Sequence, residues 1–168
     1  MGVMSPVGND CDQFFENLLG GRSGIRKLSA KFASRLTANV GGEVDYDPAA
    51  RFPRPKLALL DRFSQFALEA ASQAIHDAAI ELEDSLKDRT GVFVGTGMGG
   101  ASTIEAGYEE IFLAGKDRLP PHTVPRAMNN AAAGQISIDH GLRGPSFTYS
   151  TACSSSAIAI GEACRHAG

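Results

Sequence analysis

Apolar residues recur every three or four positions over residues 61–79, which predicts an amphipathic helix there. Small residues dominate its apolar face, so we expect this helix to pack closely on a sheet or on another helix. The residues of this face are Phe63, Ala67, Ala70, Ala71, Ala74 and Ala78. A shorter helix is predicted over residues 12–19 and ends at the GGRSG segment. Residues 29–56 contain three prolines and are predicted to be irregular.

Two short apolar segments follow, and each precedes a predicted helix. Residues 91–95 (GVFVG) predict a buried strand before a helix over 102–114. Residues 144–152 (GPSFTYSTA) predict a strand before a helix that starts at Ser154. A further helix is predicted over residues 125–141, because proline suits a first turn and glycine suits a helix end. Strands that alternate with helices are typical of an α/β fold.

The last of these helices has an unusual pattern. Residues 154–161 carry no charge, and small or apolar side chains lie on all sides of the predicted helix. A helix that is apolar all round is normally buried all round. We therefore expect Cys153, the residue just before it, to stand at the N-terminus of a deeply buried helix.

Composition and charge exclude several classes of protein. The chain has 168 residues, 43% hydrophobic and 21% charged, with a net charge of −3, which indicates one soluble globular domain. Without a basic run we expect no nucleic-acid partner. No segment approaches the ~20 apolar residues of a membrane span. The start, MGVMSPVGND, does not resemble a signal peptide, so a cytoplasmic location is expected.

The cysteines and histidines do not predict a disulfide framework or a metal site. The three cysteines, Cys11, Cys153 and Cys164, are odd in number and widely spaced, and there is no CxxC pair. The four histidines lack the spacing of metal ligands. We therefore expect no metal, and we interpret Cys164 as a structural residue of the last helix.

A glycine-rich turn follows the first of the two strands. Gly95, Gly97 and Gly100 fit the GxGxxG pattern of dinucleotide-binding proteins. That fingerprint also needs a second strand with an acidic residue about 20 positions on. Here Asp117 lies between a predicted helix end and a proline loop, so its strand is missing. The pattern favours a tight turn that needs backbone room over a nucleotide-binding module.

Cys153 has the position of a nucleophile. The thiolate is the reactive form of cysteine, and the N-terminus of a helix favours negative charge. The free N–H groups there can also receive the charge that develops on a carbonyl oxygen. The sharp turn from strand to helix would push the side chain outward, and the small neighbours Ala152, Ser154, Ser155 and Ser156 leave room for an acyl group. A buried structural cysteine remains the alternative at this point.

With these residues the chain resembles the N-terminal half of the β-ketoacyl-acyl carrier protein synthases, and the synthase II type most of all. The stretches that carry the resemblance, in family order, are GVMSPVGND, FFENLLGGRSGI, DRFSQFALEAA, GVFVGTGMGG, VPRAMNNAAAGQISIDHGLRGPS and TACSSS. The resemblance implies a thiolase-like fold of stacked α, β, α, β and α layers and a homodimer. It implies an acyltransferase of fatty-acid biosynthesis that elongates acyl chains by decarboxylative condensation with malonyl-acyl carrier protein.

The resemblance also implies roles for individual residues. Cys153 matches the nucleophile that takes the acyl chain as a thioester, and its N–H matches one donor to the oxyanion. Met98 matches a position that lines the acyl pocket and affects chain length. Thr123, Val124 and Met128 match pocket or dimer-side positions. No metal or redox cofactor is implied, and the partner is an acyl carrier protein loaded with the acyl or malonyl group.

Docking of the acidic carrier protein would use basic residues of this chain. The family often has basic residues just before the DRFSQ helix, where this chain has Ala58 and Leu59. Other basic residues are candidates for this contact, although a solvated basic face is the alternative. These residues are Arg54, Lys56, Arg62, Arg118 and Arg126.

The family takes two catalytic histidines, a lysine and a glycine-rich loop from its C-terminal half. His122 and His140 do not match those histidines. We therefore expect residues 1–168 to be an N-terminal half, inactive alone and with apolar surface exposed. A polyketide ketosynthase and a non-catalytic half that serves only for interaction remain alternatives.

Overall fold

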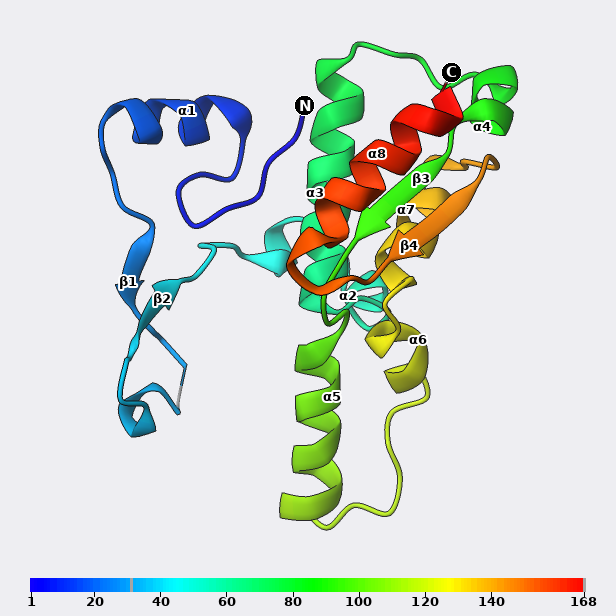
Figure 1. Cartoon of the computed structure of the whole chain (residues 1–168). Helices are drawn as coiled ribbons and strands as arrows, with labels where there is room; N and C mark the ends of the chain where they lie inside the picture. Colours follow the sequence, from blue (N-terminus) through cyan, green and yellow to red (C-terminus); the bar gives the residue numbers. More distant parts are fainter. Residues whose placement is uncertain (31, 168) are drawn as a thin grey trace. The chain divides into compact units, whose positions relative to one another are not determined.

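The structure is a computed structural model that describes residues 1–30 and 32–167 (Figure 1). The chain forms two compact units. The first comprises Met1–Pro48 and Glu69–Ile80, and the second comprises Ala49–Leu68 and Glu81–Gly168. Helix α3 (Arg62–Asp77) therefore contributes its first turns to the second unit and the rest to the first.

The first unit contains helix α1 (Cys11–Leu19) and a small hairpin besides its part of α3. Helix α1 confirms the helix predicted over 12–19, and the Asp10 side chain caps it by accepting a hydrogen bond from the Gln13 N–H at 2.7 Å. Strands β1 (Ile25–Lys27) and β2 (Val40–Gly42) pair antiparallel. The sequence did not predict this hairpin, because its strands have three residues each and lack a buried face with a period of two.

The N-terminal segment of the first unit is fastened to the second half of α3 through Gln73. The Gln73 side chain accepts a hydrogen bond from the Val3 N–H at 3.0 Å and donates one to the Asn9 carbonyl at 2.7 Å. The Met1 amino group pairs with Asp77 and holds the pKa of that carboxyl below its usual value. Gly2 packs so closely on α3 that a Cβ there would lie 1.9 Å from the Ala70 carbonyl oxygen.

A parallel pair of strands organises the second unit. Strand β3 (Val92–Gly95) pairs with β4 (Ser146–Tyr149), with Val92 opposite Ser146 and Gly95 opposite Tyr149. Helices α8 (Ser155–Ala167) and α7 (Ala131–His140) both contact the two strands, and Figure 1 shows α8 in front of them and α7 behind. The predicted α/β arrangement is confirmed.

The single helix predicted over 125–141 is wrong, because two helices occupy this region. Helix α6 (Thr123–Ala127) ends at Met128, whose backbone is extended with φ −63° and ψ 141°, and α7 begins three residues later. The Ala127 carbonyl accepts a hydrogen bond from the Gly100 N–H at 3.1 Å, a tertiary contact that no local pattern reveals. The predicted end at Gly141 is confirmed by its left-handed φ of 65°.

The remaining helices differ in how well the sequence predicted them. The helix over 102–114 appears as α5 (Ala101–Tyr108), which continues into a wider π-helical turn over Glu109–Leu113. Two short helices were not predicted, α2 (Arg54–Leu57) and α4 (Asp84–Arg89). Both are too short for an apolar period to identify.

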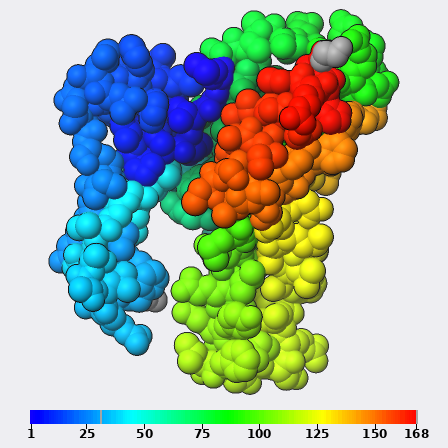
Figure 2. All heavy atoms as spheres, in the orientation of Figure 1, coloured from blue at the N-terminus to red at the C-terminus, as the bar shows by residue number. Residues whose placement is uncertain are grey.

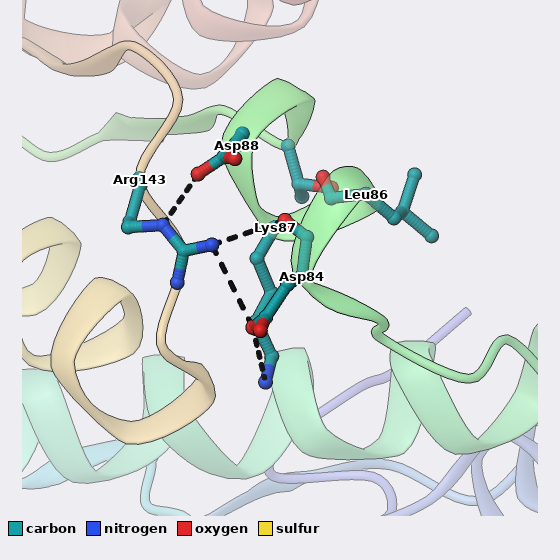
Figure 3. Close-up of polar contacts among 6 residues, drawn as sticks. Asp84, Leu86, Lys87, Asp88 and Arg143 are labelled. Atoms are coloured by element: carbon teal, nitrogen blue, oxygen red, sulfur yellow. Dashed lines mark hydrogen bonds and ion pairs between the residues drawn. The ribbon is translucent and has the colours of Figure 1, made fainter.

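Helix α4 is tied to the segment before β4 by Arg143 (Figure 3). The guanidinium donates to the Asp84 carbonyl at 3.0 Å and pairs with the Asp88 carboxylate. Lys87 contributes as well, since its carbonyl accepts from the Arg143 N–H at 2.9 Å. The hydrogen bond from Arg143 holds the pKa of Asp88 below its usual value, and the same pair raises the pKa of Arg143.

Helix α8 corrects the expectation of deep burial. Only Ser155 and Ala159 of this helix are buried among the described residues, while Ile160 is 66% exposed and both Cys153 and Cys164 are exposed. Figure 2 shows this helix, in orange and red, at the surface of the second unit. The separate expectation that the chain alone exposes apolar surface is confirmed.

A buried carboxylate joins α3 to α5 and provides a test of their packing. Asp61 is 3% exposed and accepts hydrogen bonds from the Thr103 N–H at 2.8 Å and the Thr103 hydroxyl at 2.6 Å. Asp61→Ala leaves both donors buried and unpaired, so we expect it to lower the free energy of unfolding by about 2–4 kcal/mol in a denaturant titration. The control Asp117→Ala removes an exposed carboxylate and should change it by less than about 0.5 kcal/mol. Equal effects of the two variants would show that the contact between Asp61 and Thr103 does not stabilise the fold.

The Arg143–Asp88 pair predicts a pH dependence. Because the pKa of Asp88 is lowered in the folded state, the pair contributes stability above the usual pKa of an aspartate, and this contribution is lost as the pH falls through the lowered value. Arg143→Gln should raise the pKa of Asp88 toward its usual value in a carboxyl NMR titration. Lys87→Gln should leave it unchanged, since Lys87 pairs with Asp84. An unshifted Asp88 titration in Arg143→Gln would show that the pair does not persist in solution.

Candidate active site

Cys153 lies in a sharp turn between β4 and α8. It is the middle residue of a single 3-10 turn, Ala152–Ser154, which leads directly into the helix. Ala152, just before it, has a left-handed φ of 52°, a conformation that costs a residue with a Cβ roughly 1–2 kcal/mol. The thiol therefore stands exposed at the leading end of α8, as expected for a side chain pushed outward by a sharp turn from strand to helix.

Side-chain hydrogen bonds of two serines hold this turn. The Ser155 hydroxyl accepts from the Thr151 N–H at 2.8 Å and donates to the Ala152 carbonyl at 2.7 Å, and Ser155 is only 2% exposed. The Ser154 hydroxyl donates to the Thr151 carbonyl at 2.8 Å. From the sequence these serines were interpreted only as small neighbours of Cys153. Their residue type could have indicated the capping role, because serine is favoured where a helix begins.

The first turn of α8 packs directly on the end of β3. A Cβ on Gly95 would lie 2.4 Å from the backbone carbonyl of Ser155, so only glycine fits at this contact. Gly99 has a left-handed φ of 58°, and a Cβ on Gly100 would lie 2.3 Å from the Arg126 carbonyl oxygen. The glycine turn is therefore a tight turn that needs backbone room, as predicted.

Because β3 and β4 are parallel, their carboxyl ends meet at one edge, where open α/β sheets place their sites. The Thr96 N–H donates to the Tyr149 carbonyl at 3.0 Å. Beyond the strands, the Asn129 side-chain amide donates to the Ser150 hydroxyl at 3.2 Å, and that hydroxyl donates to the Gly97 carbonyl at 3.4 Å. This edge therefore joins the glycine turn, the α6–α7 link and the Cys153 turn. The sequence did not predict the part played by Asn129 and Ser150.

Three of the four predicted pocket residues share one apolar cavity, of about 500 Å³, between α5 with its π-helical extension and α6. Thr123, Val124 and Met128 line it. Neither Met98, which is 75% exposed on the glycine turn, nor Cys153 lies in its wall. The other large side chains in its wall are Ile104, Tyr108, Ile111, Phe112 and Leu119.

Lys56 and Arg62, two of the five basic candidates, have local partners. Lys56 pairs with Asp139 and lies 5.2 Å from the ring centre of Phe52. Arg62 lies over the ring of Phe66 at 5.0 Å. Within residues 1–30 and 32–167, no group of three or more His, Cys, Asp and Glu side chains is arranged to hold a metal ion. None of the helices described in this part of the chain is long and apolar enough to cross a membrane.

The chain is similar to known proteins over nearly its whole length. The family model described as "Beta-ketoacyl synthase, N-terminal domain" matches residues 1–166. The chain is 36% identical over 166 residues to a 3-oxoacyl-[acyl-carrier-protein] synthase 2 of Coxiella burnetii. The matched region makes up 98% of this chain and 40% of the relative. It is 35% identical over 164 residues to the protein of the same name from Staphylococcus aureus, and this match makes up 97% of the chain and 40% of that relative. The chain thus spans about two fifths of these relatives.

The fold agrees with a solved structure of a type II PKS acyl-carrier protein in complex with its ketosynthase bound to the hexaketide. The TM-score is 0.77 at 22% identity, over 98% of this chain and 44% of the other. At this identity the likeness concerns the fold. It confirms the predicted fold class, the thiolase-like arrangement of a ketosynthase.

The Ser155 hydrogen bonds predict how the Cys153 turn responds to mutation. Ser155→Ala leaves the Thr151 N–H without its acceptor, so we expect the free energy of unfolding to fall by about 1–3 kcal/mol. Hydrogen exchange at the Thr151 amide should become faster. The matched control Ser156→Ala alters an exposed serine on the next position and should leave both measurements unchanged. Unaltered exchange in Ser155→Ala would contradict the role given to this side chain.

Proposed function

The chain belongs to the β-ketoacyl synthase family, and from this premise we propose that it supplies the acyl-accepting part of a 3-oxoacyl-[acyl-carrier-protein] synthase. The observation that carries the proposal is the position of Cys153, exposed at the leading end of α8 behind a left-handed Ala152. Relatives named as such synthases, at 35% and 36% identity, support it.

In the first half-reaction the Cys153 thiolate attacks the thioester carbonyl of an acyl chain carried by an acyl carrier protein. A bond forms between the Cys153 sulfur and the acyl carbon, the bond to the carrier's sulfur breaks, and the carrier leaves as its thiol after taking up a proton. Negative charge on the carbonyl oxygen is received by N–H groups at the start of α8, the Cys153 N–H among them. Covalent attachment divides one difficult reaction into two easier steps.

In the second half-reaction malonyl-acyl carrier protein loses carbon dioxide, and the carbanion that remains attacks the Cys153 thioester. A carbon–carbon bond forms, the thiolate leaves, and the product is a 3-oxoacyl chain longer by two carbons. The resemblance assigns the decarboxylation to two histidines and a lysine in the C-terminal half of the family. We place those groups beyond residues 1–168, which we take as the N-terminal half of the functional protein. The uncovered α8 supports this placement.

The apolar cavity lined by Thr123, Val124 and Met128 is the proposed site for the acyl chain, with Met98 at its approach. Strongly exposed apolar side chains surround this cavity, among them Phe112 at 75% and Val124 at 69%. A second copy of the protein is the proposed cover, because an apolar surface of this kind marks an interaction site. The homodimer expected from the resemblance is therefore retained as part of the proposal.

The proposed partner is an acyl carrier protein. The family resemblance implies it, and a solved structure with the same fold contains a type II PKS acyl-carrier protein in complex with its ketosynthase. Arg118, whose side chain is 87% accessible although it pairs with the equally exposed Asp117, is a basic candidate for contact with an acidic carrier. A cytoplasmic location and a reaction without metal or redox cofactor complete the proposal.

A polyketide ketosynthase is the alternative within the same chemistry, since such proteins share the fold. A half that serves only for interaction is the alternative without chemistry. Malonyl decarboxylation by the 168-residue chain alone would exclude the latter, although we expect no turnover without the histidines and lysine. Clear turnover would show that the chain is catalytic by itself.

The test of the proposal is to map where an acyl group attaches. The full-length protein is incubated with acyl-acyl carrier protein, and the thioester is located by peptide mass spectrometry. We expect the adduct on Cys153, its loss in Cys153→Ala, and its persistence in the matched controls Cys11→Ala and Cys164→Ala. Attachment at Cys11 or Cys164 in place of Cys153 would overturn the proposal.

A further inference from the structure

We infer that Asn129 and Ser150 are positioning residues, whose hydrogen bonds hold the acyl-pocket residues in register with Cys153 and so set which acyl-chain lengths react. This inference rests on the proposed function and extends it to two residues outside the predicted site. We call the hydrogen bonds from Asn129 to Ser150 and from Ser150 to Gly97 the Asn129–Ser150 bridge.

The bridge joins three segments that come from distant parts of the sequence. The Asn129 side-chain amide lies 3.2 Å from the Ser150 hydroxyl, and that hydroxyl lies 3.4 Å from the Gly97 carbonyl oxygen. Asn129 belongs to the link between α6 and α7, Ser150 follows the end of β4, and Gly97 lies in the turn after β3. The Ser150 hydroxyl therefore connects all three segments at the edge that carries the site.

Each end of the bridge is adjacent to a residue of the proposed reaction. Asn129 directly follows Met128, which lines the apolar cavity, and Gly97 directly precedes Met98. Ser150 lies three residues before Cys153, at the point where β4 gives way to the turn. Movement of any of these segments would change the distance between the cavity and the thiol.

Other hydrogen bonds hold parts of these segments, among them one from the Gly99 N–H to the Thr96 hydroxyl at 3.2 Å and one from the Ala131 N–H to the Met128 carbonyl at 3.0 Å. The Thr96 N–H bonds to Tyr149 and the Gly100 N–H bonds to Ala127. Between Thr96 and Gly100, the Asn129 side chain lies against Gly99, where a Cβ would be 2.4 Å from the Asn129 side-chain oxygen. Asn129 therefore packs closely against Gly99, and the bridge adds a further contact to the stretch that carries Met98.

The bridge matters for selectivity because methionine side chains are flexible. Met98 and Met128 can adopt many rotamers, so the backbone on either side determines the space they leave for a chain. With the bridge intact, both methionines start from fixed backbone positions. Without it, the turn and the α6–α7 link keep the main-chain bond from Gly100 to Ala127 but can shift further at Met98 and Met128, and the pocket should accept chains of different length more evenly.

The experiment measures acyl-chain selectivity in the full-length protein. The rate of thioester formation on Cys153 is compared for a short and a long saturated acyl group on the carrier protein, in the wild type, Asn129→Ala and Ser150→Ala. We expect the ratio of the two rates to move toward one by about 3- to 10-fold in both variants, which corresponds to the loss of a single hydrogen bond. Ser150→Thr keeps the hydroxyl and should restore the wild-type ratio. Asn130→Ala is the matched control, since the Asn130 side chain makes no capping hydrogen bond.

Alkylation of Cys153 by iodoacetamide, which has no acyl chain, separates positioning from general damage. We expect its rate and the melting temperature to change little in the bridge variants. An unchanged selectivity ratio in Asn129→Ala and Ser150→Ala, or an equal loss of acylation, alkylation and stability, would overturn the inference while leaving Cys153 as the nucleophile. A wild-type ratio already near one would do the same. Absence of any acyl adduct on Cys153 in the wild type would overturn the proposed function as well.

Discussion

The structure of the site depends on the hydrogen bonds of Ser155. The hydroxyl of this buried serine accepts from the Thr151 N–H and donates to the Ala152 carbonyl, and so closes the turn between β4 and α8. These contacts, with the packing of Ser155 on Gly95, hold Ala152 in its left-handed conformation. Strain of this kind persists only where the surrounding structure determines it. The direction of the Cys153 side chain follows from that conformation.

The parallel pairing of β3 and β4 then decides what surrounds the thiol. Both strands end at the same edge, so the turn with Met98 and the turn with Cys153 become neighbours although some fifty residues separate them in sequence. The α6–α7 link joins the same edge through Asn129. The cavity and the thiol are distinct places connected by this edge, which explains why no single local motif contains the whole site.

The sequence predicted those features that local chemistry determines. The strand, the cysteine and the following helix were each identifiable from the sequence. The glycine turn was identifiable as well, and the structure shows why it needs glycine, since Gly95 and Gly100 leave no room for a Cβ. Contacts between distant segments could not be predicted. The helix over 125–141 is broken where the Ala127 carbonyl bonds to Gly100, and Asn129 acquires its partner only in the folded chain. The exposure of α8 differs from expectation because its apolar pattern indicates burial without indicating which residues provide the cover.

The division of α3 between two units affects the order of events during synthesis. Residues 1–48 leave the ribosome well before Gln73, whose side chain fastens Val3 and Asn9. The first unit therefore cannot complete its packing until the second half of α3 has been made. Domains generally fold as they emerge from the ribosome. This N-terminal segment therefore remains incompletely packed until the second half of α3 has been synthesised. It is during this interval that a chaperone would find its apolar side chains uncovered.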